Sequence, residues 1–335
     1  MKPAKTEPLR LAFLGSDPIA LPLLNWLAED GRAIAEVVGV FTQPDRPAGR
    51  GRTIAANAIK RWASERNIPV RQPERLTQAE REELARLGAD LSLVVAYGHI
   101  LGEKFIETPR LGTLNLHASL LPRYRGASPI QTAIACGERE TGVSLMRIVR
   151  ELDAGPVADC ERIAVGELDT AAELEAKVAA ACVPLLSRAL PLLAAGRLAF
   201  VEQDPARASY CRLLSKEDGA VDFGAPARAL AARINGLFPW PGCSVDLGGL
   251  SVKIGLADSP SEGEPGAASP GTVLGSDGHG LLVSTSAGVI RFRKLQRPGG
   301  RMLPASEFLR GFPVAPGTLL PSKAMAALAG PKPFH

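Results

Sequence analysis

Short apolar runs alternate with amphipathic stretches through the first half of the chain. The runs LRLAFLG, IAEVVGVF and LSLVVAYG are separated by stretches such as PIALPLLNWLAED and LTQAEREELARLG. This rhythm is typical of βαβ units, in which helices join parallel strands. Residues 91–96, 113–116 and 143–149 are short and apolar, as expected for central strands of such a sheet. Ligands of these sheets bind at the carboxyl ends of the strands.

The pattern changes in the second half. Residues 169–193 predict one long helix, kinked at Pro184, and a helix at 226–235 is followed by short strands between Gly-rich turns. Strands at this spacing predict a small, OB-like β-barrel, in which residues 259–271 form a flexible excursion, and the last residues predict a frayed tail. We expect an α/β, Rossmann-like parallel-sheet domain at 1–201, a linker at 202–209, a C-terminal β-barrel at 210–315 and a tail at 316–335.

Composition supports an ordinary globular chain. The 335 residues are 46% hydrophobic and carry 39 Lys and Arg against 35 Asp and Glu, a net charge of +4. These values exclude a disordered chain, a coiled coil and a collagen-like repeat, and the length favours two domains. No apolar run approaches the roughly 18 residues that span a membrane, so we expect a cytoplasmic protein with no membrane partner.

Several kinds of site are missing from the sequence. The five cysteines are scattered without a C-x-x-C pair, and the four histidines are not paired at ligand spacing, so we expect no metal. The sequence also lacks G-x-G-x-x-G after the first strand, a Walker-type loop and a G-x-S-x-G elbow. The sheet is therefore not expected to bind a dinucleotide or ATP in the usual way.

One stretch, GTLNLHASLLPRYRGASP, carries side chains suited to catalysis. Because residues two apart on a strand face the same side, Asn115 and His117 point together where a predicted strand ends. An amide donor beside an imidazole suits acyl transfer, since one stabilises an oxyanion and the other moves a proton near neutral pH. Taken alone, the pair is also consistent with two ordinary polar residues at a strand end.

An acidic turn follows the next predicted strand, in VSLMRIVRELDAGPV. Asp153, at the end of a strand neighbouring that of His117, could orient the imidazole and favour its charged form. By itself the residue is equally a turn-forming Asp before a glycine. Taken together, the two motifs favour a catalytic group of Asn115, His117 and Asp153 more than either does alone.

NLHASLLPRYRGASP and LDAGP together resemble the family of formyltransferases that use N10-formyltetrahydrofolate. QPDRPAGRGR, RLLSKEDGAVDF and NGLFPWPG are similar to segments of the members that act on methionyl-tRNA, and the resemblance covers residues 9–312. It implies transfer of the formyl group of N10-formyltetrahydrofolate to the α-amino group of methionyl initiator tRNA, for translation initiation. We expect this enzyme to be a monomer that binds tRNA and folate.

The resemblance also implies residue roles. Asn115 and His117 match the family's catalytic pair, and Asp153 matches its catalytic aspartate. They imply direct attack of the methionyl amine on the formyl carbon, with Asn115 and His117 stabilising the oxyanion and no covalent enzyme intermediate. The residues that match the folate site are Ser119, Leu120, Leu121 and Pro122 in a loop, and Val95, Ala96 and Tyr97 at a strand end.

Two basic segments are the expected contacts with RNA. QPDRPAGRGRTIAANAIKR resembles the loop with which family members approach the acceptor stem, although the family usually has a proline-containing segment where this chain has IAANAI. RFRKLQRPGGR contains no acid, and on a strand Arg291 and Arg293 would share a face with Leu295. A solvated basic surface also accounts for either segment. The predicted tRNA contacts are Arg46, Arg50, Arg52, Arg291, Arg293 and Lys294.

Three other functions are open at this point. A formyltransferase for an amino sugar nucleotide would share the catalytic residues, but the basic QPDRPAGRGR loop argues against it. A formyl-folate hydrolase would use water in place of the amine and would leave that loop without a role. A non-catalytic RNA-binding protein would have no need of the intact Asn115, His117 and Asp153.

Overall fold

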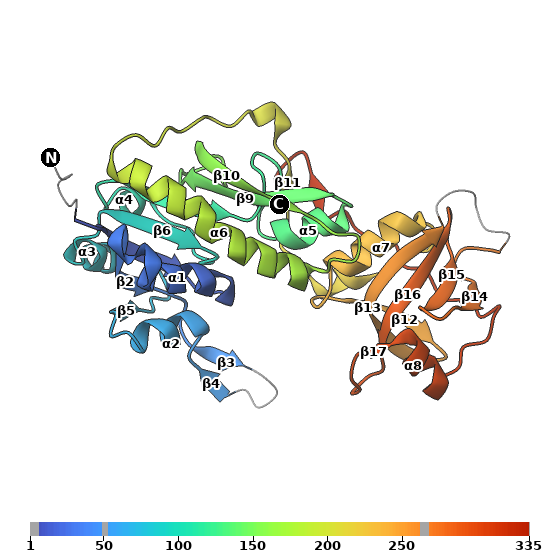
Figure 1. The fold of residues 1–335 in the computed structure, drawn as a ribbon. Helices are drawn as coiled ribbons and strands as arrows, with labels where there is room; N and C mark the ends of the chain where they lie inside the picture. The colour runs from blue at the N-terminus through green and yellow to red at the C-terminus, as the bar shows by residue number, and fades with distance from the viewer. Residues whose placement is uncertain (1–6, 49–52, 262–267, 335) are drawn as a thin grey trace. The chain divides into compact units, whose positions relative to one another are not determined.

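A computed structural model describes residues 7–48, 53–261 and 268–334 (Figure 1). The chain divides into two compact units. Unit 1 comprises Met1–Pro122, Gly142–Ile163 and Ala176–Arg207, and unit 2 comprises Arg123–Thr141, Ala164–Glu175 and Ala208–His335. Unit 2 thus includes two segments that precede the predicted linker.

Unit 1 is built on a seven-stranded sheet in the order β10-β9-β7-β6-β1-β2-β5. Strands β5, β2, β1, β6 and β7 are parallel, which confirms the predicted α/β fold, and the order reverses between β1 and β6. The strands are β1 (Leu9–Gly15), β2 (Ala35–Phe41), β5 (Val70–Arg71), β6 (Leu91–Val95), β7 (Thr113–His117), β9 (Glu140–Arg147) and β10 (Val157–Ala164).

Strand β9 runs antiparallel to β7, with Leu114 opposite Arg147 and His117 opposite Ser144. The expectation that residues 143–149 form a further parallel strand is therefore wrong in direction. An apolar run indicates that a strand is buried on both faces of a sheet. Parallel and antiparallel strands are buried in the same way, so the run does not predict the direction of the strand.

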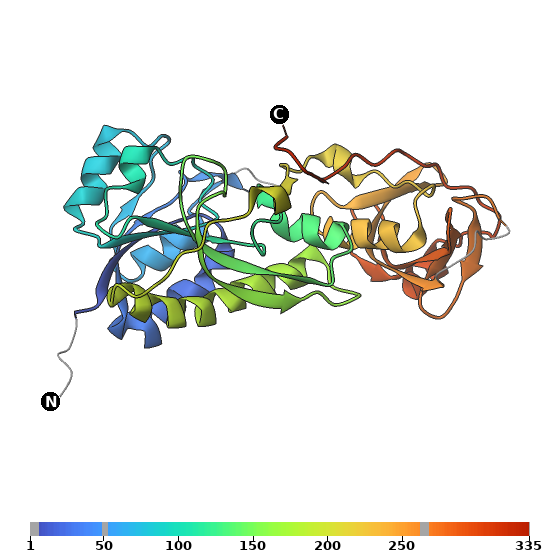
Figure 2. The same ribbon diagram turned by 90° about the horizontal axis from the view of Figure 1, so that it is seen from above.

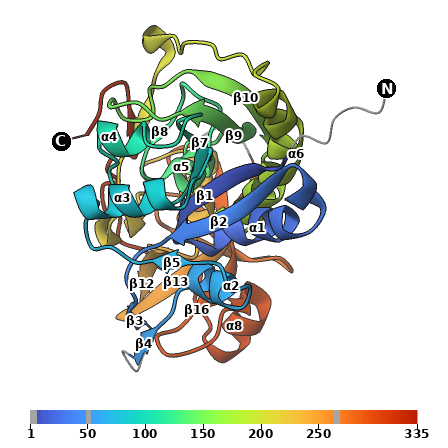
Figure 3. The same ribbon diagram turned by 90° about the vertical axis from the view of Figure 1, so that its left-hand side faces the viewer.

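Helices cover both faces of this sheet. Figures 2 and 3 show α3 and α4 on one face and α1 and α6 on the other. On the α3 and α4 face, Leu14, Phe41 and Val94 from the strands pack with Leu84 and Phe105 from the helices. The helices are α1 (Leu21–Ala28), α2 (Ala58–Ser64), α3 (Gln78–Arg86), α4 (Glu103–Ile106) and α6 (Ala171–Ala194), with short 3-10 turns η1 (Pro18–Ala20), η2 (Asp30–Ala33) and η3 (Pro205–Arg207).

Helix α6 has 24 residues and runs through Pro184 and Pro191. By length and composition alone it is apolar enough to cross a membrane, so the expectation that no apolar run approaches that length is wrong for this helix. Half of its most apolar window is buried inside the protein, and buried residues recur along one side, as in Leu174, Val178 and Leu185. This spacing is that of a helix packed on a core.

Unit 2 contains a curled antiparallel sheet in the order β12-β13-β16-β15-β14, with β17 paired to β16. The sheet forms a half-barrel, which confirms the predicted small OB-like domain, and α7 packs on β13 and β16. Its strands are β12 (Cys243–Leu247), β13 (Leu250–Ser261), β14 (Val273–Ser276), β15 (Leu281–Ser284), β16 (Val289–Gln296) and β17 (Leu303–Pro304), and its helices are α5 (Pro129–Ala135), α7 (Ala227–Gly236), α8 (Ala305–Gly311) and the 3-10 turn η4 (Lys216–Gly219).

The C-terminal segment is part of unit 2. A small sheet pairs β18 (Ala329–Gly330) with β11 (Tyr210–Cys211), which in turn pairs with β8 (Arg125–Gly126). The side chains of Arg212 and Arg233 donate to backbone oxygens of residues 327 and 326 at 3.0 and 2.8 Å. The prediction of a frayed tail is therefore wrong, because partners more than 90 residues away hold the segment. In the predicted excursion at 259–271, residues 262–267 lie outside the described residues.

Candidate active site

Asn115 and His117 lie on β7, near the carboxyl end of the strand. Asn115 pairs with Val94 of β6 on one side and with Met146 of β9 on the other. Asn115 is half-buried, and His117 is 6% exposed. The structure thus holds both side chains on a central strand, two residues apart, as the sequence predicts.

Asp153 lies close to His117 because of the path of the loop after β9, which the sequence does not predict. Because β9 is antiparallel, its last residue, Arg147, lies beside Leu114, near the amino end of β7. The loop after β9 returns toward the other end, where Asp153 Oδ2 lies 3.6 Å from His117 Nδ1. The structure therefore brings the predicted pair together, although Asp153 does not stand at the end of a neighbouring strand.

Three features define the turn that carries Asp153. The residue has φ +47°, in the left-handed region, and a Cβ at Gly155 would lie 2.0 Å from the carbonyl oxygen of Arg147. Gln203 Nε2 donates to the carbonyl oxygens of Asp153 and Gly155 at 2.8 and 2.7 Å. Gln203 lies in the predicted linker, so no local pattern identifies its role.

Ser144 of β9 holds the loop after β7. Its hydroxyl donates to the carbonyl oxygen of Ser119 at 2.7 Å and accepts the backbone N–H of Leu121 at 3.1 Å. Ser119 is fully buried, and the side chain of Leu120 packs where a Cβ at Gly142 would lie. The loop 119–122 that the sequence assigned to folate is thus fixed beside His117 by the neighbouring strand.

The residues after β6 lie where the strand order reverses, which is the usual ligand position in such sheets. Ala96 is exposed and has φ +47°, whereas Val95 and Tyr97 are buried. The carbonyl oxygen of Tyr97 accepts hydrogen bonds from Ser16 Oγ and Gln43 Nε2 at 3.4 and 3.2 Å. Burial raises the pKa of the Tyr97 phenol, whose side chain packs into the core. Of the three residues, Ala96 therefore presents its side chain at the surface.

Two large apolar side chains are exposed in the loops at this edge. Ile100 follows β6 and is 98% exposed, and Leu152 precedes Asp153 and is 57% exposed. Exposed apolar side chains in the loops of a sheet edge that also carries an amide and an imidazole suit a flat, partly apolar ligand with a reactive carbonyl group. Neither residue was predicted, because an isolated apolar residue in a loop has no periodicity.

The basic loop after β2 begins as a hairpin of β3 (Arg46–Ala48) and β4 (Thr53–Ala55). Its base is fixed by Asp45, which pairs with Lys60 and accepts Gln72 Nε2 at 2.7 Å. The hydrogen bond from Lys60 holds the pKa of Asp45 below its ordinary value. Arg46 is exposed on the hairpin, and Arg50 and Arg52 lie outside the described residues.

In the second basic segment, the sides of β16 differ from those predicted. Phe292 and Leu295 are fully buried, whereas Arg291 and Arg293 lie on the partly exposed side. The pairing of β13 with β16 shifts register on both sides of Leu256, so residues three apart share the buried side. The expectation that the two arginines share a face with Leu295 is therefore wrong.

Asp258 of β13 binds both arginines. Arg291 donates to the two carboxylate oxygens at 2.8 and 2.6 Å, and Arg293 donates to one of them at 2.9 Å. The hydrogen bond to Asp258 holds the pKa of Arg291 above its ordinary value. Lys294 is exposed next to this pair. The structure thus places Lys294 on the surface and the two arginines in an ion-pair network.

The described residues contain no candidate metal site. No group of three or more His, Cys, Asp or Glu side chains there is placed to hold a metal ion. None of the five cysteines forms a disulfide. Burial raises the pKa of Cys182 and of Cys243 to about 12, so these two thiols are protonated at neutral pH.

Known proteins resemble the chain over nearly its whole length. Residues 9–190 match the formyl transferase family, and residues 213–313 match the formyl transferase C-terminal domain. A methionyl-tRNA formyltransferase of Gluconobacter oxydans is 40% identical over 314 residues, which cover 93% of this chain and 100% of that relative. One of Pseudomonas fluorescens is 41% identical over 303 residues, which cover 90% and 93%.

The fold is shared with solved structures of lower identity. WlaRD, a sugar 3N-formyl transferase crystallised in the presence of dTDP and 5-N-formyl-THF, has a TM-score of 0.64 at 17% identity. The similarity covers 88% of this chain and 100% of that chain. At this identity the likeness establishes the fold, and the acceptor substrate must be inferred from other features.

Proposed function

The chain belongs to the formyl transferase family, and from this premise we propose the reaction that it catalyses. It transfers the formyl group of N10-formyltetrahydrofolate to the α-amino group of methionyl initiator tRNA. The product is formylmethionyl-tRNA, which serves translation initiation. The observation that carries this function is the extent of the similarity, since a relative of this named activity is 40% identical over 93% of the chain.

We assign the chemistry to Asn115, His117 and Asp153. The Asn115 amide donates a hydrogen bond to the oxyanion that forms when the amine attacks the formyl carbon, and His117 supports the same oxygen. A bond forms between the methionyl nitrogen and the formyl carbon, and the bond from that carbon to N10 breaks. The amine loses a proton through water with help from Asp153, and N10 gains one to leave as tetrahydrofolate.

The donor substrate is assigned to the sheet edge beside these residues. Its contacts are the loop Ser119, Leu120, Leu121 and Pro122 and the strand end Val95, Ala96 and Tyr97. The position of Ala96 at the reversal of strand order supports this placement, as do the exposed side chains of Ile100 and Leu152.

The tRNA is assigned to the two basic segments, through Arg46, Arg50, Arg52, Arg291, Arg293 and Lys294. Among the last three, Lys294 is the first candidate for a phosphate contact, because Asp258 occupies both arginines. We also propose that the protein is a monomer and acts in the cytoplasm. Light scattering after gel filtration would test the oligomeric state.

The test of this function is a panel of acceptors with N10-formyltetrahydrofolate as donor. The acceptors are methionyl initiator tRNA, free methionine, an amino sugar nucleotide and water. We expect rapid product with the charged tRNA only, and loss of that product in His117→Ala. Formate release without formylated tRNA would indicate the hydrolase, and a formylated sugar nucleotide would indicate the other transferase.

A further inference from the structure

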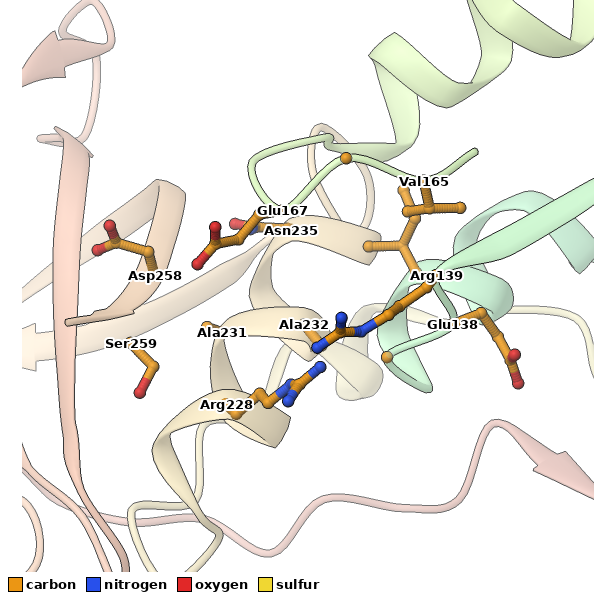
Figure 4. Close-up of a pocket in the computed structure, with 13 residues that line it drawn as sticks. Glu138, Arg139, Val165, Glu167, Arg228, Ala231, Ala232, Asn235, Asp258 and Ser259 are labelled. Carbon is orange, nitrogen blue, oxygen red and sulfur yellow. The ribbon is translucent and has the colours of Figure 1, made fainter. Parts of the chain in front are cut away.

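Charged side chains in the two units have different kinds of partner. A cavity of about 310 Å³ lies within unit 2, and the carboxylates of Glu138 and Asp258 on its wall pair with Arg123 and Arg291 (Figure 4). Ion pairs within that unit therefore account for these two carboxylates. In unit 1, by contrast, Arg147 lies on an aromatic ring at the start of the loop that carries the proposed catalytic aspartate.

Arg147, the last residue of β9, joins two parts of unit 1. The carbon of its guanidinium group lies 4.1 Å from the centroid of the Phe200 ring. Its Nη1 donates to the carbonyl oxygen of Leu111, just before β7, at 3.2 Å. Both Arg147 and Phe200 are half-buried, and a cation over an aromatic face is bound more tightly as water is excluded from the contact. The arginine thus ties the segment after α6 to the central sheet.

Phe200 begins a short segment, residues 200–203, that closes the loop between β9 and β10. Val201 and Val157, the first residue of β10, exchange two backbone hydrogen bonds at 2.8 and 2.9 Å. Gln203 then donates to the carbonyl oxygens of Asp153 and Gly155. The segment 200–203 therefore contacts the end of the loop and the turn within it.

The position of the Gln203 amide depends on how the segment is held. An extended run of four residues spans about 10 Å from the first to the last, so a change of direction at one end displaces the other. Val201 is 69% exposed, and its side chain therefore adds little packing to the two bonds of the bridge. The ring of Phe200 under Arg147 supplies a second fixed point, and two points set the direction of the segment.

We propose that Arg147 is a positioning residue for formyl transfer and acts on Asp153 through Phe200 and Gln203. The proposal rests on the proposed function, because it concerns the catalytic group assigned there. No bond forms or breaks at Arg147. The arginine holds the ring, the segment holds the Gln203 amide against the turn, and Asp153 stays 3.6 Å from His117.

The first experiment compares Arg147→Met with Arg66→Met in formylation of methionyl-tRNA. Arg66 makes the same two kinds of contact in unit 1, since it lies 4.7 Å over the Trp62 ring and donates to the Trp62 carbonyl oxygen at 3.2 Å. Methionine keeps much of the length of arginine and removes the charge and the donors. We expect kcat to fall about threefold to tenfold in Arg147→Met, with the KM for tRNA unchanged, and to keep its wild-type value in Arg66→Met.

A second background separates positioning from a general structural role. In Asp153→Asn, Arg147→Met should change kcat by less than about twofold, because the arginine acts through the carboxylate that is already lost. A fall by the same factor in both backgrounds would overturn the proposal. Phe200→Leu removes the ring from the same contact and should repeat the results of Arg147→Met, so either variant can serve if the other fails to fold.

Amide hydrogen exchange of residues 148–156 tests the contact without any substrate. We expect exchange in this loop to be about threefold to tenfold faster in Arg147→Met than in the wild type, and unchanged in Arg66→Met. Wild-type exchange in Arg147→Met would overturn the proposal. This measurement is independent of the acceptor panel, so a failure of the proposed function and a failure of the positioning role would be distinguished.

Discussion

Gln203 provides the sharpest test of how the proposed catalytic group is positioned. Its amide donates two hydrogen bonds, at 2.8 and 2.7 Å, to the carbonyl oxygens of Asp153 and Gly155. Gln203→Leu has a similar size and removes both donors. The two carbonyl groups then lose partners that hold Asp153 3.6 Å from His117.

The magnitude follows from the two bonds. A neutral hydrogen bond contributes about 0.5–1.5 kcal/mol, so the pair contributes about 1–3 kcal/mol to this turn. The left-handed backbone conformation of Asp153 costs about 1 kcal/mol when the turn forms. This cost is the same in the wild type and in the variant. A loss near 2 kcal/mol lowers the population of the formed turn up to about 30-fold, so we expect kcat to fall about 10- to 30-fold.

The assay is formylation of methionyl-tRNA with both substrates saturating, together with the KM for each. Gln203→Leu should lower kcat and leave the KM for tRNA unchanged, because the turn contacts the proposed catalytic group. A matched control is Gln72→Leu, since Gln72 Nε2 also donates two bonds, at 2.8 and 2.7 Å, but to Gln43 and Asp45 at the base of the hairpin. That variant should raise the KM for tRNA and spare kcat. A Gln203→Leu enzyme with wild-type kcat, or the same fall in kcat for both variants, would refute the reasoning.

Two further predictions concern backbone space and a buried charge. Gly155→Ala places a Cβ 2.0 Å from the Arg147 carbonyl oxygen, so kcat should fall at least tenfold, whereas Gly278→Ala, with open space around it, should be neutral in the same assay. An unchanged kcat in Gly155→Ala would show that the loop can shift without effect. Burial raises the pKa of Asp218, but hydrogen bonds from Arg212 and a backbone N–H lower it by more, and the net shift is downward. A lowered pKa stabilises the fold above the unfolded value near 3.9, and this stabilisation is lost as the pH falls through the folded value. The free energy of unfolding of Asp218→Asn should therefore be about 3–5 kcal/mol lower than that of the wild type at pH 7. Denaturant curves should show this difference unchanged down to about pH 4 and shrinking only at lower pH, and a constant difference across the whole range would contradict the ion pair.

Local patterns were sufficient to predict much of this protein. The periods of 2 and 3.6 residues are properties of single strands and helices, so the alternating runs predicted the α/β unit and the small antiparallel domain. Asn115 and His117 are two residues apart on one strand, and their common direction needs no knowledge of the rest of the chain. Family motifs then indicated Asp153 as their partner.

Contacts between distant residues were decided only by the tertiary structure. The direction of β9 depends on how its backbone pairs with β7, which an apolar run does not encode. Gln203 reaches the Asp153 turn from 50 residues away, and Arg291 finds Asp258 at a separation of 33. Buried hydrogen-bond donors and buried charges need partners, and the tertiary fold determines which residues lie close enough to be those partners. The type of one residue does not specify which distant residue will be its neighbour.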